Sequence, residues 1–174
     1  MQRQFKTEGI ILKRRQLLNK DLLITLNTFE YGKINVMAKG VRDIKSKRLS
    51  AILTGNLVDV ILYNRFDRYY LQSTHIISLF SSIIKDEKKQ KSLFFFLYVL
   101  DQLLPEGQKE EKVYNLQKKF MIEIANNGLS NASLIKFANR ILALLGYRAE
   151  STSMYELLST LEEITVKKIP SFII

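Results

Sequence analysis

The densest group of side chains able to do chemistry in this sequence is the basic segment MAKGVRDIKSKRLSA at residues 37–51. It contains one acidic residue, Asp43, together with five cations. The five cations are Lys39, Arg42, Lys45, Lys47 and Arg48. Cations this close together repel one another unless water or a polyanion screens them. The segment is therefore either an ordinary solvated loop or a binding site for phosphate groups, and its own residues leave both interpretations open.

Other cations in the first half of the chain extend this candidate site. They are Lys13, Arg14, Arg15, Lys33, Arg65 and Arg68. Phe66, Tyr69 and Tyr70 lie beside the last two cations, and aromatic rings are surfaces on which nucleic-acid bases stack. The pattern predicts a basic groove that follows a phosphate backbone. In the alternative interpretation the loops are only solvated, and Tyr69 and Tyr70 belong to the core.

The sequence carries none of the common enzyme signatures. It has no Walker-type phosphate loop, no GxGxxG, no HExxH and no GxSxG. It contains a single histidine and no cysteine, which excludes thiol catalysis and cysteine-ligated zinc. We therefore expect a binding protein and not an enzyme, with no catalytic residue, no metal and no cofactor.

The charge of the chain is concentrated in its first half. The formal net charge is +10, and residues 1–75 carry 14 Lys/Arg against 6 Asp/Glu. Residues 76–174 carry 13 Lys/Arg against 11 Asp/Glu. An excess of positive charge attracts nucleic acid or an anionic membrane, but it says nothing about the fold.

The first half of the chain has the pattern of β-strands. Short segments rich in β-branched and aromatic residues occur at 8–15, 21–29, 32–40, 56–64 and 68–76. In the third segment Ile34, Val36 and Ala38 alternate with polar residues, so they should face inward while Lys33, Asn35 and Lys39 face outward. Five such strands predict a small, closed or partly closed barrel.

The second half has the pattern of α-helices. Apolar residues recur at helical spacing over 88–104, 109–125, 131–145 and from Ser153 onward. Asn131 is suited to cap the third helix, Gly146 to end it, and SMYE at 153–156 to form a capping box for the fourth. We predict an α+β protein with a barrel domain at 1–80 and a helical domain at 81–174.

No segment of the sequence is typical of a signal peptide or a membrane span. The longest apolar run, LFFFLYVL at 93–100, has eight residues, whereas a membrane-spanning helix needs about 20. The patterns therefore predict a soluble, cytoplasmic protein.

Several short motifs follow one another within residues 6–53. They are Leu12–Lys13, Asp21–Leu22, Thr28 with Gly32–Lys33, and Ala38–Lys39–Gly40 with Arg42 and Ser46. In their order and spacing they resemble the RecO family of bacterial DNA-repair and recombination-mediator proteins. Farther along, FANRILALLGYR at 137–148 resembles the helix that precedes the family's zinc-binding segment. By position, Lys39 and Arg42 match the family's basic turn, and Lys33 matches its Gly-Lys pair.

This resemblance implies an N-terminal OB-fold followed by a helical domain. It also implies binding of single- and double-stranded DNA, annealing of complementary strands, and help in loading RecA onto coated DNA. RecR and the acidic C-terminal tail of the single-strand DNA-binding protein would be partners, and the protein would be associated with the nucleoid. Many members carry paired cysteines with zinc after the LGY segment, whereas this chain has RAESTSMYE, so we expect no zinc and a shortened helical domain.

Two alternatives from other functional classes remain at this stage. An RNA-binding OB-fold module would share every argument from charge. A protein-interaction adaptor would act through the helical domain and the apolar tail IPSFII at 169–174, although packing into the core is the commoner fate of such a tail.

Overall fold

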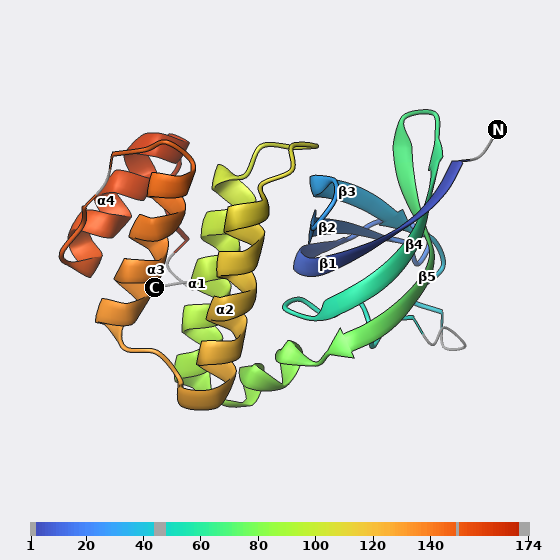
Figure 1. The fold of residues 1–174 in the computed structure, drawn as a ribbon. Helices are drawn as coiled ribbons and strands as arrows, with labels where there is room; N and C mark the ends of the chain where they lie inside the picture. Colours follow the sequence, from blue (N-terminus) through green and yellow to red (C-terminus); the bar gives the residue numbers. More distant parts are fainter. Residues whose placement is uncertain (1–2, 44–47, 149, 171–174) are drawn as a thin grey trace. The chain divides into compact units, whose positions relative to one another are not determined.

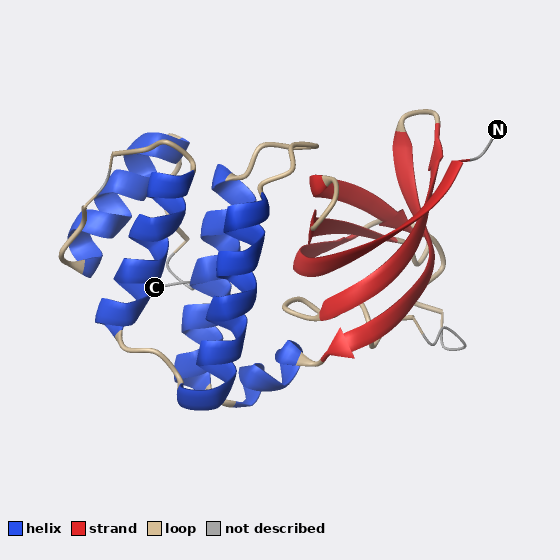
Figure 2. Ribbon diagram, in the orientation of Figure 1, coloured by secondary structure: helices blue, strands red, loops and turns tan. Residues whose placement is uncertain are grey.

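The computed structural model describes residues 3–43, 48–148 and 150–170, with strands first and helices second (Figures 1 and 2). The chain divides into two compact units. The first, here called the barrel unit, comprises Met1–Ser81 and Pro105–Glu111. The second, the helical unit, comprises Ser82–Leu104 and Lys112–Ile174. The predicted α+β class is confirmed.

The described part of the barrel unit contains five β-strands that close into a barrel. The strands are β1 (Arg3–Gln16), β2 (Leu22–Thr28), β3 (Gly32–Ala38), β4 (Leu57–Arg65) and β5 (Arg68–Ser78). Their order around the barrel is β1-β2-β3-β5-β4, and every neighbouring pair is antiparallel except the parallel pair β3–β5 that closes it. This is the predicted OB-like barrel, and closure leaves it without an unpaired edge strand.

Alternation of side chains along the strands builds the barrel core. Ile24 and Leu26 on β2 pack with Ile34, Val36 and Ala38 on β3, and all five are buried. These are apolar residues at every second position, as expected for strands with one face inside a barrel. The predicted inward set of β3 is therefore confirmed.

Residues 105–111, which connect two helices, belong to the barrel unit and lie against β3. Lys33 and Glu106 form a parallel bridge, and the N–H of Gly107 donates to the carbonyl oxygen of Lys33 at 2.9 Å. The side-chain amide of Asn35 donates to the Glu106 carboxylate at 2.8 Å. Local sequence patterns did not indicate this pairing, because its partners lie about 70 residues apart along the chain.

The described part of the helical unit contains four α-helices after a short 3₁₀ helix, η1 (Phe80–Lys85). The helices are α1 (Glu87–Leu103), α2 (Glu111–Asn127), α3 (Asn131–Leu144) and α4 (Met154–Thr165). An aromatic cluster holds three of them together. Phe96 of α1 stacks on Phe120 of α2 with ring centroids 3.6 Å apart, and Phe137 of α3 packs edge-on against both rings. Aromatic contacts of this kind stabilise a core beyond simple burial.

The helix ends follow the predicted capping pattern with one exception. The cap of α3 is Ser130, whose side chain accepts from the N–H of Ser133, and the prediction of Asn131 was wrong. Asn131 is instead the first helical residue. Gly146 adopts a φ of 87° just after α3, which is the left-handed conformation expected at a helix end. Ser153 and Glu156 form the predicted capping box of α4.

The capping box of α4 should make stability depend on pH. Hydrogen bonds from the N–H and hydroxyl of Thr152 and from the N–H of Ser153 lower the pKa of Glu156. A lowered carboxyl pKa stabilises the folded state above the unfolded value of about 4.3, and this contribution is lost as the pH falls through the folded-state pKa. In urea unfolding, wild type should exceed Glu156→Gln in stability at pH 7, and the difference should be smaller at pH 3. An equal difference at both pH values would contradict this.

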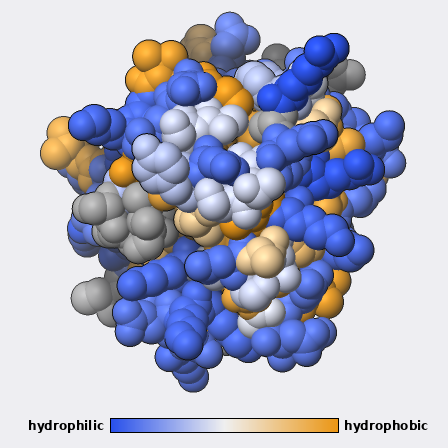
Figure 3. Space-filling model, turned by 90° about the vertical axis from the view of Figure 1, so that its left-hand side faces the viewer, coloured by the Kyte–Doolittle hydropathy of each residue, from blue (hydrophilic) through white to orange (hydrophobic). Residues whose placement is uncertain are grey.

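The face of the molecule seen in Figure 3 is mostly hydrophilic. Figure 3 shows hydrophilic residues (blue) over most of the visible face, with hydrophobic residues (orange) in small separate areas. Among the described residues, no helix has the length and apolar character needed to cross a membrane.

Candidate nucleic-acid interface

A groove on the outer surface of the barrel unit brings together residues from four strands and two loops. Its volume is about 370 Å³. It is lined by Arg15, Leu17, Leu23, Asn35, Met37, Asp67, Arg68 and Tyr69. In OB-folds, the face of strands 2 and 3 between the β1–β2 and β4–β5 loops is the surface that binds oligonucleotides. The groove lies on this face of the barrel, because its lining includes residues of β2, β3 and both loops.

The floor of the groove consists of outward-facing side chains of β2 and β3. Leu23 and Met37 are half-buried and lie directly opposite each other in the strand register. They give an apolar surface of the kind on which a base can rest. Asn35 is exposed beside them, and its amide is held by Glu106 while its side-chain oxygen accepts from the Thr25 hydroxyl at 2.9 Å.

Two exposed arginines stand at the edges of the groove. Arg15 comes from β1, and Arg68 begins β5. Each guanidinium group can donate two hydrogen bonds to one phosphate. The groove therefore combines an apolar floor with cationic edges, although Asp67 also contributes one negative charge.

One face of the β4–β5 hairpin carries an aromatic and cationic surface. Tyr63 and Tyr70 lie opposite each other and stack, with ring centroids 5.1 Å apart and an interplanar angle of 12°. Arg65 and Arg68 form the next cross-strand pair on the same face, because side chains two positions apart share a face. The Lys39 ammonium lies 5.0 Å from the centre of the Tyr70 ring. Sequence reasoning had named Tyr70 and missed Tyr63.

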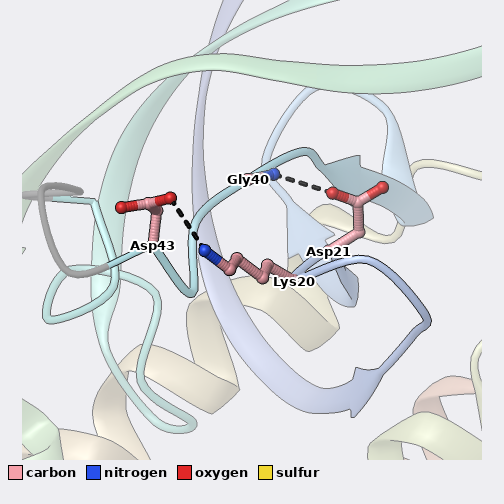
Figure 4. Close-up of polar contacts among 4 residues, drawn as sticks. All are labelled: Lys20, Asp21, Gly40 and Asp43. Carbon is pink, nitrogen blue, oxygen red and sulfur yellow. Dashed lines mark hydrogen bonds and ion pairs between the residues drawn. The ribbon is translucent and has the colours of Figure 1, made fainter.

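Much of the basic segment at 37–51 serves the structure of the loops themselves. The Asp21 carboxylate accepts a hydrogen bond from the N–H of Gly40 at 2.7 Å, and Lys20 pairs with Asp43 at 3.1 Å (Figure 4). These two contacts join the β1–β2 loop to the turn that follows β3. Gly40 suits this turn because its φ is 61°, a left-handed conformation that other residues rarely adopt.

Two arginines of the segment donate to main-chain carbonyls. Arg48 donates to the carbonyl of Lys39 at 2.9 Å and to that of Leu71 at 3.4 Å. Arg42 is exposed and donates to the carbonyl of Leu17 at 3.5 Å. Both side chains thus contribute to the structure of the loops. Lys45 and Lys47 lie outside the described residues.

The remaining predicted cations lie on β1 and β3, and neighbouring side chains along a strand point to opposite faces. Lys33 alternates with the inward-facing Ile34, but it is only 8% exposed because residues 106–107 pair with its main chain and cover it. On β1, Lys13, Arg14 and Arg15 are exposed, but Arg14 alternates with its neighbours and lies opposite the inward-facing Ile24. Burial lowers the pKa of Arg14 from its usual value. Arg15 and Arg68 line the groove, and Lys39 and Arg65 lie with Arg68 on the hairpin face.

Comparison with known proteins assigns the barrel to a family. The family described as "Recombination protein O N terminal" matches residues 1–80, which include all five strands of the barrel. By its amino-terminal domain, the chain belongs to the RecO family. Two of the motifs that resemble RecO, Asp21–Leu22 and Ala38–Lys39–Gly40, are joined by the hydrogen bond from the N–H of Gly40 to the Asp21 carboxylate.

Curated relatives extend the similarity into the helical unit. The chain is 30% identical over 146 residues to "DNA repair protein RecO" of Caldanaerobacter subterraneus, covering 83% of this chain and 59% of the relative. A Thermoanaerobacter protein of the same name is 29% identical with the same coverage. The RecO of Chlorobaculum parvum is 26% identical over 94% of this chain and 66% of its own length. The chain spans about three fifths of the length of the first two relatives.

A second groove of this RecO-family chain lies between α2 and α3 in the helical unit. Its volume is about 620 Å³. Its apolar lining comes from Leu116, Phe137 and Ala143, and its cations are Lys119, Lys136 and Arg140. Ser133, Asn139, Glu123 and Glu150 complete it. Among the described residues, no three His, Cys, Asp or Glu side chains lie close enough to hold a metal ion.

Proposed function

We propose that this protein binds DNA through the groove and hairpin face of its barrel unit and acts as a recombination mediator in DNA repair. The observation that carries the proposal is that Arg15 and Arg68 line one groove, while Arg68 also belongs to the hairpin face that carries Arg65, Lys39 and the stacked pair Tyr63–Tyr70. The relatives that it resembles are DNA repair proteins by name.

Each part of this surface matches one part of a DNA strand. Guanidinium and ammonium groups bind the phosphates, which are the same in every sequence. The tyrosine rings and the Leu23–Met37 floor receive the flat, apolar faces of bases. Backbone contacts carry no base information, so binding should be independent of sequence.

Annealing of two complementary strands follows from the same surface without covalent chemistry. Bound cations reduce the repulsion between two phosphate backbones and keep the strands close. Base pairing then supplies the free energy that drives the strands together. In this scheme the protein works at the nucleoid in the cytoplasm, and with RecR it assists the loading of RecA.

The helical unit supplies a site for a protein partner in this proposal. The groove between α2 and α3 has an apolar floor and three cations, which suit a short peptide with acidic and apolar residues. The C-terminal tail of the single-strand DNA-binding protein has this chemistry. Glu123 and Glu150 at the same groove would limit how many acidic side chains it accepts.

A salt titration of the whole chain tests the DNA-binding step. Affinity for a fluorescent single-stranded oligonucleotide should fall with a slope of about −3 in log K against log salt, as about four phosphate contacts require. Single-stranded RNA of equal length serves as competitor. Absence of binding, or a clear preference for RNA, would overturn the proposal.

A further inference from the structure

The tip of the β4–β5 hairpin presents a bare aromatic ring. Phe66 is 82% exposed, and Figure 1 shows the hairpin extending beyond the other strands of the barrel. A large apolar side chain normally leaves water when the chain folds. Phe66 stays in water, so packing does not account for its place at the tip.

The backbone at this tip is held in a conformation that is unfavourable for Phe66. Phe66 and Asp67 have φ values of 51° and 55° in a two-residue hairpin turn. Turns with two positive φ angles favour Asn and Gly, while a bulky residue at positive φ is an outlier. Such strain clusters at functional sites, and here it is combined with exposure.

Positive charge surrounds the ring on both strands. The guanidinium carbon of Arg65 lies 5.2 Å from the centre of the Phe66 ring, and Arg65 and Arg68 are cross-strand partners. An exposed ring between two arginines is complementary to a polyanion that also offers flat apolar faces. Nucleic acid has both properties.

We propose that Phe66 inserts between two neighbouring bases of the bound strand, stacking on one of them while Arg65 and Arg68 bind the flanking phosphates. The inference rests on the proposed function and adds a positioning role for the hairpin tip. Apolar side chains placed between bases unstack them at a cost that is lowest where the bases are unpaired. The hairpin should therefore favour single-stranded segments over intact duplex.

The test uses the full chain with Phe66→Asn, which removes the ring and suits the turn conformation. Affinity for a single-stranded oligonucleotide should fall about tenfold, because one base–aromatic stack is lost. The slope against salt should not change, because no charge is removed. Val166→Asn is the matched control, since Val166 is 88% exposed with a φ of 53° but lies at the end of α4.

A second variant reports the contact directly. The sequence contains no tryptophan, so Phe66→Trp introduces a single indole at the tip. Its fluorescence should be quenched on binding single-stranded DNA, with affinity kept near that of wild type. Wild-type affinity in Phe66→Asn together with unquenched indole fluorescence would overturn the inference while leaving the proposed function intact. If Phe66→Asn lost binding to phosphatidylglycerol vesicles but kept wild-type affinity for DNA, the ring would be assigned to a membrane. The inference would then be overturned as well.

Discussion

Replacing Arg15, Lys39, Arg65 and Arg68 together by glutamine is expected to weaken binding of single-stranded DNA roughly 600-fold at 0.1 M salt. Each phosphate contact contributes about 0.7 to the salt slope, so four contacts give about 2.8. Extrapolated from 1 M to 0.1 M salt, this corresponds to between two and three orders of magnitude in affinity. The slope in log K against log salt should approach zero in the same variant.

The matched control removes the same number of charges from the other unit. Lys85, Lys88, Lys112 and Lys168 are all exposed and belong to the helical unit. Their joint replacement by glutamine lowers the net charge equally, so only the position of the charges differs. Circular dichroism of both variants establishes that the fold is kept. Equal losses of DNA affinity would mean that net charge alone drives binding, and that the barrel groove is not the site.

Gly32→Ala is expected to lower the free energy of unfolding by about 4 kcal/mol, which is a melting temperature roughly 10 °C lower. Gly32 has a φ of 64°, and a Cβ placed there would lie 1.8 Å from the main-chain oxygen of Gln108. The atoms nearest this Cβ position all belong to the main chain of Gln108, so no flexible side chain can move to relieve the contact. The substitution should therefore separate residues 105–111 from β3.

Gly107→Ala distinguishes this collision from simple backbone strain. Gly107 has a φ of 71° in the same 105–111 segment, but no described atom lies within 4 Å of its Cβ position. Gly107→Ala should lower the free energy of unfolding only by the cost of placing a residue with a side chain in the left-handed conformation, about 1 kcal/mol. Thermal and urea unfolding of both variants measure the difference. Equal destabilisation would show that residues 105–111 are free to move away from Gly32.

The strands and helices of this protein could be predicted because buried apolar residues recur along the sequence with the period of a strand or a helix. The strands of the barrel begin and end within a few residues of the predicted segments except at the start of β1, and the capping box at Ser153–Glu156 forms as expected. The prediction for α3 failed by one residue because both Ser130 and Asn131 are good caps. A choice between two neighbouring capping residues depends on small differences in geometry.

The candidate site could be predicted only in its residue types. Charge and aromatic content indicated a phosphate-binding surface, but they could not tell which cations share it. Arg48 donates to main-chain carbonyls, and Lys33 lies under residues 106–107. Tyr63 was missed because its importance comes from the cross-strand partner Tyr70.

The sequence alone thus determined the fold class, the basic character of the first half and the kinds of groups available for binding. Only the tertiary structure decided which of those groups face one groove. The reason is physical: periodicity reports whether a side chain is buried, while its neighbours across a sheet depend on pairing between residues far apart in the chain. Arg15 and Arg68, 53 positions apart, meet at one groove for that reason.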